Sequence, residues 1–196
     1  MSKGIKILIG VVGLLIIAYF SIKGTYNNMV NLDETVNQAW GQVENVYQRR
    51  ADLIPNLVNT VKGYATHEKE TLTGVVEARA KATSVNIDAN NLTAQNMQQF
   101  QQAQQGLTSA LSKLMVVVEK YPDLKANQNF MQLQAQLEGT ENRIAVERQK
   151  FNVSVENFNK TIRNFPASIW AGLFGFEEKP YFKMQEGADK VPEVNF

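Results

Sequence analysis

Apolar residues recur mostly at every third or fourth position between residues 26 and 65. They are Met29, Leu32, Val36, Ala39, Val43, Val46, Leu53, Leu57, Val61 and Tyr64. This spacing lines one face of an α-helix. A helix over residues 26–65 would be roughly 60 Å long, which is more than a compact domain needs. Other helices must therefore lie along it to cover its apolar face, and the stretch predicts an elongated helical bundle.

An uncharged stretch, ILIGVVGLLIIAYFSI, precedes this helix at residues 7–22 and is flanked by Lys6 and Lys23. As a helix it would extend roughly 24 Å, and the lysine stems lengthen it toward the ~30 Å of a hydrocarbon core. A cleaved signal peptide is the alternative, but residues 18–22 offer no small-x-small cleavage site. We therefore predict an uncleaved single-pass anchor that holds the protein in membrane lipid. Its apolar residues include Ile7, Leu8, Val11, Leu14, Leu15, Ile16 and Ile17.

The lysines around the anchor indicate its orientation. Lys3 and Lys6 precede the span, whereas Lys23 is the only basic residue that follows it before Arg49. Positive charge is retained on the cytoplasmic side of a membrane. We expect the bundle to face the extracytoplasmic space, with a cytoplasmic bundle as the alternative.

The spacing of apolar residues, together with residues that favour turns and helix ends, predicts three more helices. We expect a kink at Pro55, a short second helix over residues 67–81, and a turn-rich tip at 83–91. The third helix begins near Thr93 and repeats in sevens, at Met97, Phe100, Gln104, Leu107, Leu111, Leu114, Val118 and Tyr121. The fourth begins near Asn127 and places Phe130, Leu137, Ile144, Phe151, Phe158 and Phe165 seven residues apart. The prediction is an all-α fold, with a transmembrane helix followed by an antiparallel four-helix bundle.

The chain divides into three parts on this interpretation. Residues 1–25 form the anchor, residues 26–165 the bundle, and residues 166–196 an aromatic segment near the membrane with an irregular C-terminal tail. The aromatic segment follows a helix that returns toward the bilayer. Its apolar patch of Ile169, Trp170, Leu173 and Phe174 either sits in the membrane interface or closes the base of the bundle.

Polar residues interrupt the apolar rows at mid-bundle. Arg50 continues the seven-residue series of Met29, Val36 and Val43, and the fourth helix is polar around Glu141. Two antiparallel helices would bring these regions together, so we expect an internal ion network that fixes their register at some cost in stability. Its predicted members are Arg49, Arg50, Asp52, Glu141, Asn142 and Arg148.

Catalytic chemistry finds little support in the sequence. His67 is the only histidine and there is no cysteine, so metal and nucleophile sites lack their usual residues. No phosphate-binding or dinucleotide-binding glycine motif is present. A formal net charge of +1, with both signs interspersed, provides no basic stripe for nucleic acid. We predict no catalytic, cofactor or metal residues and no nucleic-acid partner.

Two functional hypotheses remain. The first is a non-enzymatic scaffold that contacts other membrane or envelope proteins, with or without self-association. The second is a module that binds a lipid or small molecule in a pocket at the membrane-proximal base. A closed bundle interior favours the scaffold, and a lined cavity above about 300 Å³ favours the ligand.

Several stretches of the chain carry a family resemblance. They are LDETVNQAWGQVENVYQRRADLIPNLVNTVKGYATHE at 32–68, EARAKA at 77–82, LQAQLEGTENRIAVERQKFN at 133–152, IRNFP at 162–166 and GFEEKPYF at 175–182. In these stretches the chain resembles the LemA family, although Glu147 stands where LemA-like sequences often have alanine. The resemblance implies a bacterial membrane protein with one N-terminal span and an antiparallel four-helix bundle. It implies an adaptor rather than any established enzymatic activity.

Overall fold

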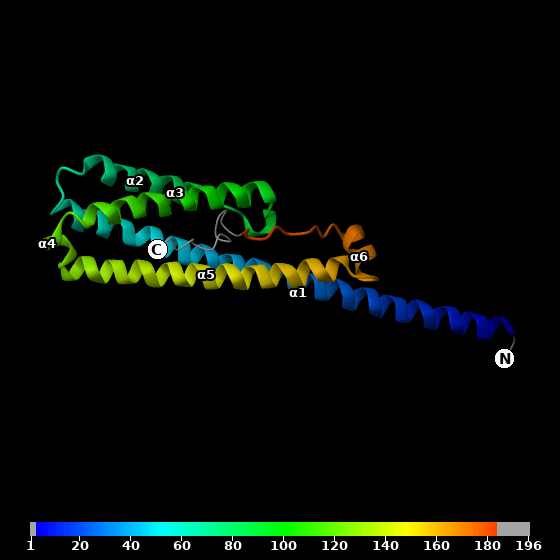
Figure 1. The fold of residues 1–196 in the computed structure, drawn as a ribbon. Coiled ribbons are helices and arrows are strands. Elements are labelled where there is room, and N and C mark those ends of the chain that lie inside the picture. The colour runs from blue at the N-terminus through cyan, green and yellow to red at the C-terminus, as the bar shows by residue number, and fades with distance from the viewer. Residues whose placement is uncertain (1–2, 184–196) are drawn as a thin grey trace, which may run out of the picture.

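The computed structural model describes residues 3–183, which are helical except for connecting loops and one extended C-terminal segment. The helices are α1 (Lys3–Lys62), α2 (Lys69–Ser84), α3 (Ala94–Val118), α4 (Pro122–Lys125), α5 (Gln128–Arg163) and α6 (Ala167–Phe174), with a 3₁₀ turn η1 (Ala89–Asn91) before α3 (Figure 1). The predicted all-α fold is confirmed. The irregular tail predicted beyond residue 183 lies outside the described residues.

Two long helices organise the bundle. α5 runs antiparallel along α1, and α2 and α3 form a hairpin against the half of α1 that is farther from the N-terminus (Figure 1). α1, α2, α3 and α5 thus alternate in direction as a four-helix bundle. The core has a basal cluster around Trp40, Phe151 and Phe158 and a distal cluster around Leu57 and Leu114.

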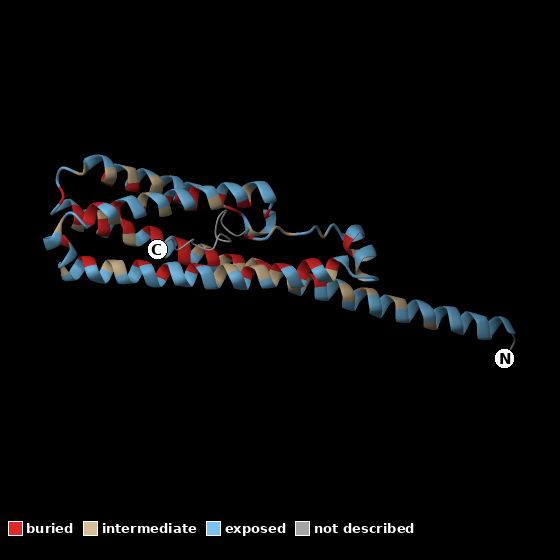
Figure 2. Cartoon of the chain, viewed as in Figure 1, coloured by how far each residue is buried: buried red, intermediate tan, exposed pale blue. Residues whose placement is uncertain are grey.

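The N-terminal part of α1 leaves the bundle as a bare helix (Figure 2). All seven predicted anchor residues are exposed there. The helix is long and apolar enough to cross a membrane. α1 continues without a break from the anchor into the core of the bundle.

Local capping explains where α3 and α5 begin. The Thr93 hydroxyl accepts the backbone N–H of Asn96 at 3.2 Å, and the Asn96 side chain accepts the N–H of Thr93 at 2.8 Å. The Asn127 side chain accepts the N–H of Phe130 at 3.0 Å. These bonds satisfy N–H groups that have no partner within the helix, so both predicted start sites are confirmed.

Pro55 lies inside α1, and the helix continues through it to Lys62, as expected for a proline that does not end the helix. Proline has no N–H to donate to the carbonyl four residues earlier, which belongs to Ala51. The Arg79 Nε–H of α2 donates to that carbonyl at 2.7 Å. The proline therefore creates a free acceptor on α1 that helps to hold α2 in place.

The seven-residue series of α5 ends earlier than predicted. Phe165 lies beyond the end of α5 at Arg163 and is 82% exposed, so its predicted core position is wrong. The residue before a proline is disfavoured in helical conformation, and Pro166 follows directly.

Candidate functional site

Arg50 is the buried charge at the centre of the bundle. It lies on the core face of α1 and is only 2% exposed. Its Nη1 donates to the Glu141 carboxylate at 2.6 Å and to the Thr108 hydroxyl at 3.1 Å. Its Nη2 donates to the Gln104 side-chain oxygen at 2.6 Å. One arginine thereby links α1 to both α3 and α5.

The charges of this cluster are unequally buried. The Glu141 side chain is 44% exposed, so water stabilises the anion while the protein surrounds the cation. The guanidinium also lies 5.1 Å from the centre of the Tyr47 ring, a cation–π contact. Burial raises the pKa of the Tyr47 phenol. The cluster therefore pairs a buried positive charge with one half-exposed carboxylate and otherwise surrounds it with neutral groups, an arrangement suited to positioning helices.

Three of the predicted network residues do not reach the interior. Arg49, Asp52 and Asn142 are exposed, and Asp52 instead accepts a hydrogen bond from Gln48 of its own helix at 2.8 Å. Adjacent helix positions differ by about 100° around the axis, so a residue near a buried one can face solvent, as these three do. Their assignment to the internal network was therefore wrong.

Gln104 and Thr108 complete the cluster in place of those residues. Gln104 is buried, its side-chain N–H donates to the Ala82 carbonyl at 3.3 Å, and the Thr108 hydroxyl donates to the Gln104 carbonyl at 3.1 Å. The signal for Gln104 was present in the sequence, because it occupies a core position in the seven-residue repeat of α3. A polar residue at such a position requires a polar partner inside the bundle.

An extended segment at residues 175–183, here called the C-terminal strap, covers the basal half of the bundle where α2 is absent (Figure 1). The Asn159 side chain of α5 exchanges two hydrogen bonds with the backbone of Lys179, at 2.8 and 2.9 Å. The Asn152 side chain does the same with Phe182, at 3.1 and 2.8 Å. Seven helical residues and three extended residues both span roughly 10 Å, so the two pairs are in register.

Side chains of the strap add to this attachment. Phe182 stacks on Trp40 with ring centres 5.8 Å apart and meets Phe151 edge-on at 5.3 Å. The Lys179 ammonium lies 2.6 Å from the Asp33 carboxylate of α1. Arg148, predicted for the internal network, borders the Arg50 cluster, and it also lies over the Phe182 ring at 4.8 Å and donates to the Lys183 carbonyl at 2.9 Å. The strap is thus attached to α1 and α5, and its Phe182 side chain belongs to the basal core.

The predicted membrane-proximal patch divides between two environments. Ile169, Leu173 and Phe174 are exposed, whereas Trp170 is half-buried against the basal core. The Phe174 ring packs edge-on against Tyr26 of α1 with centres 4.9 Å apart. α6 therefore closes the base through one side and presents apolar side chains on the other.

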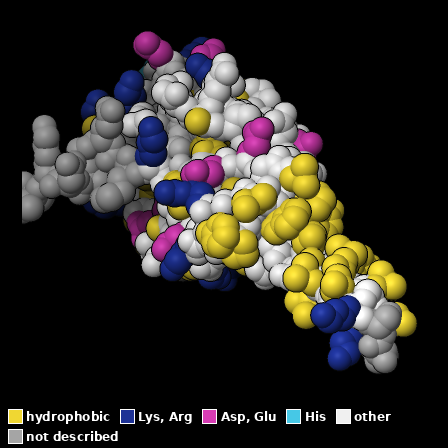
Figure 3. Space-filling model, turned by 90° about the vertical axis from the view of Figure 1, so that its right-hand side faces the viewer, with side chains coloured by type: hydrophobic (Ala, Val, Ile, Leu, Met, Phe, Trp, Pro, Cys, Tyr) yellow, Lys and Arg dark blue, Asp and Glu magenta, His cyan; other side chains and the backbone are white. Residues whose placement is uncertain are grey.

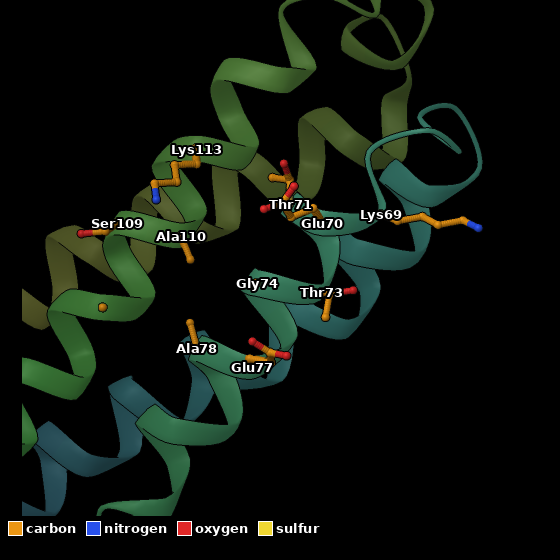
Figure 4. A pocket seen from close by; sticks show the side chains of 11 residues that line it. Lys69, Glu70, Thr71, Thr73, Gly74, Glu77, Ala78, Ser109, Ala110 and Lys113 are labelled. Carbon is orange, nitrogen blue, oxygen red and sulfur yellow. The ribbon is translucent and has the colours of Figure 1, made fainter.

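A furrow of about 740 Å³ runs between α2 and α3 on the outer face of their hairpin. Ala78 and Ala110 point toward one another across the gap between the two helices, and Gly74 faces it (Figure 4). Gly106 also lines the furrow, and Lys69, Glu70, Glu77 and Lys113 supply charges of both signs around it. This is an open surface feature with an apolar floor and a polar margin.

A second groove lies between α3 and α5. One part, of about 430 Å³, is lined by the Arg50 cluster and several glutamines of α3, and another, of about 540 Å³, by Leu111, Met115 and Leu137. Both parts are open to the surface. α6 lines neither the furrow nor this groove.

Titratable groups gather nowhere in the described part of the chain as a reactive centre. Within residues 3–183, no three His, Asp or Glu side chains are close enough to hold a metal ion. His67 is exposed near the start of α2. Burial raises the pKa of Glu44, and the nearby charge of Asp88 raises it further.

Comparison with known proteins adds a family and several relatives. A model described as the LemA family matches residues 39–196. "Magnetosome protein MamQ 2" of Paramagnetospirillum magneticum is 25% identical, over 84% of this chain and 66% of the relative. "Magnetosome protein MamQ" of Magnetospirillum gryphiswaldense is 24% identical, over 96% and 76% respectively. "Protein LemA" of Metamycoplasma hominis is 24% identical, over 76% and 64%. The chain thus spans about two thirds of the length of the first of these relatives.

Proposed function

Because the chain belongs to the LemA family, as its motifs predicted, we propose that it is a non-enzymatic scaffold anchored in the bacterial inner membrane. The α2–α3 furrow is the surface that we assign to protein partners. The membrane association itself is supported by the exposed apolar helix and by the magnetosome relatives. The partner that we propose is a helical segment of another envelope protein, and self-association through the same surface is a variant of this role.

The glycines of the furrow carry this proposal. A Cβ added at Gly74 or at Gly106 would meet no atom within 4 Å, so the packing of α2 on α3 would accept alanine at both positions. Glycine inside a helix costs about 1 kcal/mol relative to alanine. Two such residues in one furrow keep it open without improving the fold, which favours a role in binding. Small residues allow the backbone of a partner helix to approach closely.

The position of the furrow on the rod suits a partner held away from the bilayer. Arg79 contacts Ala51, and α1 rises roughly 44 Å from Ile22 to Ala51. Gly74 and Ala78 precede Arg79 on an antiparallel helix, so they lie farther still along the rod. The charged margin matches the polar rim of ordinary protein interfaces. Because α1 is one continuous helix, the position of the anchor in the membrane determines the height of this surface above the bilayer.

Filling the furrow tests the proposal. Gly74→Gln and Gly106→Gln place a side chain in the furrow, and Gly41→Gln on α1 is a matched control, because a Cβ at Gly41 also meets no atom within 4 Å. Proteins crosslinked to the full chain in intact cells are then purified and identified. We expect the furrow variants to lose specific partners that the wild type and the Gly41 variant retain. Equal partner sets in all four proteins would contradict the proposal.

The orientation of the bundle needs its own measurement. We propose that the bundle is extracytoplasmic, since Lys3 and Lys6 flank the span on its N-terminal side and only Lys23 flanks it on the other side before Arg49. The chain contains no cysteine, so Val116→Cys on α3 introduces a unique and exposed thiol. A membrane-impermeant maleimide should label it in intact cells. Labelling only after the cells are opened would place the bundle in the cytoplasm.

A further inference from the structure

The base of the bundle carries exposed apolar side chains that the proposed scaffold role does not use. On α6, Ile169 is exposed and Leu173 is 70% exposed, and Phe165 lies just before the helix. Ala171 is buried on the opposite side, which attaches α6 to the core. The orientation of α6 is therefore fixed by the fold, with its apolar side facing away from the protein.

The membrane anchor determines the height of this apolar side. Phe174 and Phe176 pack on Tyr26, with ring centres 4.9 and 5.9 Å away. Along the unbroken helix α1, Tyr26 is only roughly 6 Å beyond Ile22, the last residue of the uncharged stretch. The headgroup layer of one leaflet is itself about 5–7 Å thick. With the stretch in the hydrocarbon core, α6 is placed at headgroup depth.

The two apolar surfaces are also continuous. Viewed from the anchor end, hydrophobic side chains cover the protruding helix and continue onto the base of the bundle beside it (Figure 3). An exposed apolar patch on a protein surface commonly marks a binding site, and here the adjoining surface is the membrane anchor. The position of the patch next to the anchor therefore makes the bilayer the expected binding partner.

Charges at the base are nearly balanced. Lys23, Lys160 and Arg163 are basic and exposed, and Glu177 and Glu178 of the strap are acidic and exposed. Arg163 and Glu178 also face one another at 3.7 Å. Such a base has no strong attraction for anionic headgroups, so its contact with lipid depends on apolar burial.

We propose that α6, with Phe165, inserts its apolar side into the headgroup region of the leaflet at which the span ends. The bundle then has two membrane contacts, the span at the start of α1 and α6, which packs beside α1. A single helix leaves a bundle free to rotate about its axis and to tilt, whereas a second contact restricts both motions. This contact does not depend on the scaffold role or on any protein partner.

Spin labels on single cysteines test the depth of α6 in the full chain. Leu173→Cys is the test site, and Val116→Cys on α3 is the control, because the native side chains are 70% and 67% exposed. Leu14→Cys in the span is the reference for a position in lipid. Each labelled protein is reconstituted in phosphatidylcholine vesicles and exposed to oxygen, which concentrates in lipid, and to a water-soluble nickel chelate. Helical content and thermal unfolding confirm that each variant is folded.

We expect the oxygen-to-nickel accessibility ratio at Leu173 to be several-fold higher than at Val116 and to approach that at Leu14. Adding phosphatidylglycerol to the vesicles should leave it unchanged. A ratio at Leu173 equal to that at Val116 would overturn the proposal. Insertion only in the presence of phosphatidylglycerol would also overturn it, because charge and not apolar burial would then hold α6.

Discussion

Replacement of the Arg50 cluster by apolar residues should leave the stability of the bundle nearly unchanged, although each single replacement weakens it. Arg50→Met leaves the buried Gln104 oxygen without its donor at 2.6 Å, a loss of about 1–3 kcal/mol. Glu141 contributes little to that loss, because its side chain is 44% exposed and water replaces the arginine. Gln104→Leu removes an acceptor from a buried cation and should cost about 2 kcal/mol or more.

The double variant removes donor and acceptor together and fills the space with apolar atoms. Replacing a buried polar cluster in this way is commonly neutral or stabilising, so Arg50→Met/Gln104→Leu should lie within about 1 kcal/mol of the wild type. The two changes should therefore couple by about 2 kcal/mol or more. Urea unfolding of the full chain in mild detergent, followed by circular dichroism, measures all four free energies of unfolding.

A second cycle on the same helix provides the control. Gln48 and Asp52 are exposed and hydrogen-bonded at 2.8 Å, so Gln48→Ala and Asp52→Ala should couple by less than about 0.5 kcal/mol. Additive losses at Arg50 and Gln104, or a double variant less stable than either single one, would refute the reasoning. The cluster would then stabilise the bundle rather than fix the register of its helices.

Three further predictions concern single contacts. Arg79→Met should cost about 1–2 kcal/mol of unfolding free energy, because it leaves the Ala51 carbonyl unpaired. In a Pro55→Ala background the cost should be clearly smaller, because residue 55 regains an N–H that can donate to this carbonyl. Equal costs in the two backgrounds, measured by urea unfolding, would contradict this. Asn159→Ala should release the strap, and faster amide hydrogen exchange throughout residues 176–183 would reveal it, whereas unchanged exchange would show that the aromatic contacts suffice. Folding raises the pKa of Glu44 above 4.5, so the contribution of Glu44 to stability is largest below pH 4.5 and is lost as pH rises through the folded-state pKa. Glu44→Gln should therefore be more stable than the wild type near neutral pH. An identical pH dependence of the free energy of unfolding in both proteins would exclude this cause.

Periodicity was sufficient to predict the helices because their apolar rows are long. The series from Phe130 to Phe158 on α5 has no interruption in its spacing, and Asn127 marks its start with a capping side chain. The series failed at Phe165, where the local effect of Pro166 outweighed the pattern.

The polar contacts were harder to predict, for two different reasons. Membership of the Arg50 cluster depends on the rotation of each helix about its axis, so the adjacent Arg49 faces solvent while Gln104 of a distant helix faces the core. The position of the strap depends on hydrogen bonds between the Asn159 side chain and the backbone of Lys179. An extended segment of this kind has no periodic sequence pattern from which these bonds could be predicted. Asn159 is buried next to Phe158, and a buried polar side chain needs a partner, but this burial is visible only in the structure.

The most direct test of the scaffold is site-specific photocrosslinking in intact cells. A photoreactive residue replaces Ser109 in the α2–α3 furrow of the full chain, and a second protein carries it at Val153, an exposed apolar position on α5. The scaffold predicts discrete protein adducts from Ser109, with another envelope protein or a second copy of the chain, that are absent from Val153. No protein adduct from Ser109, or the same adducts from both positions, would contradict it.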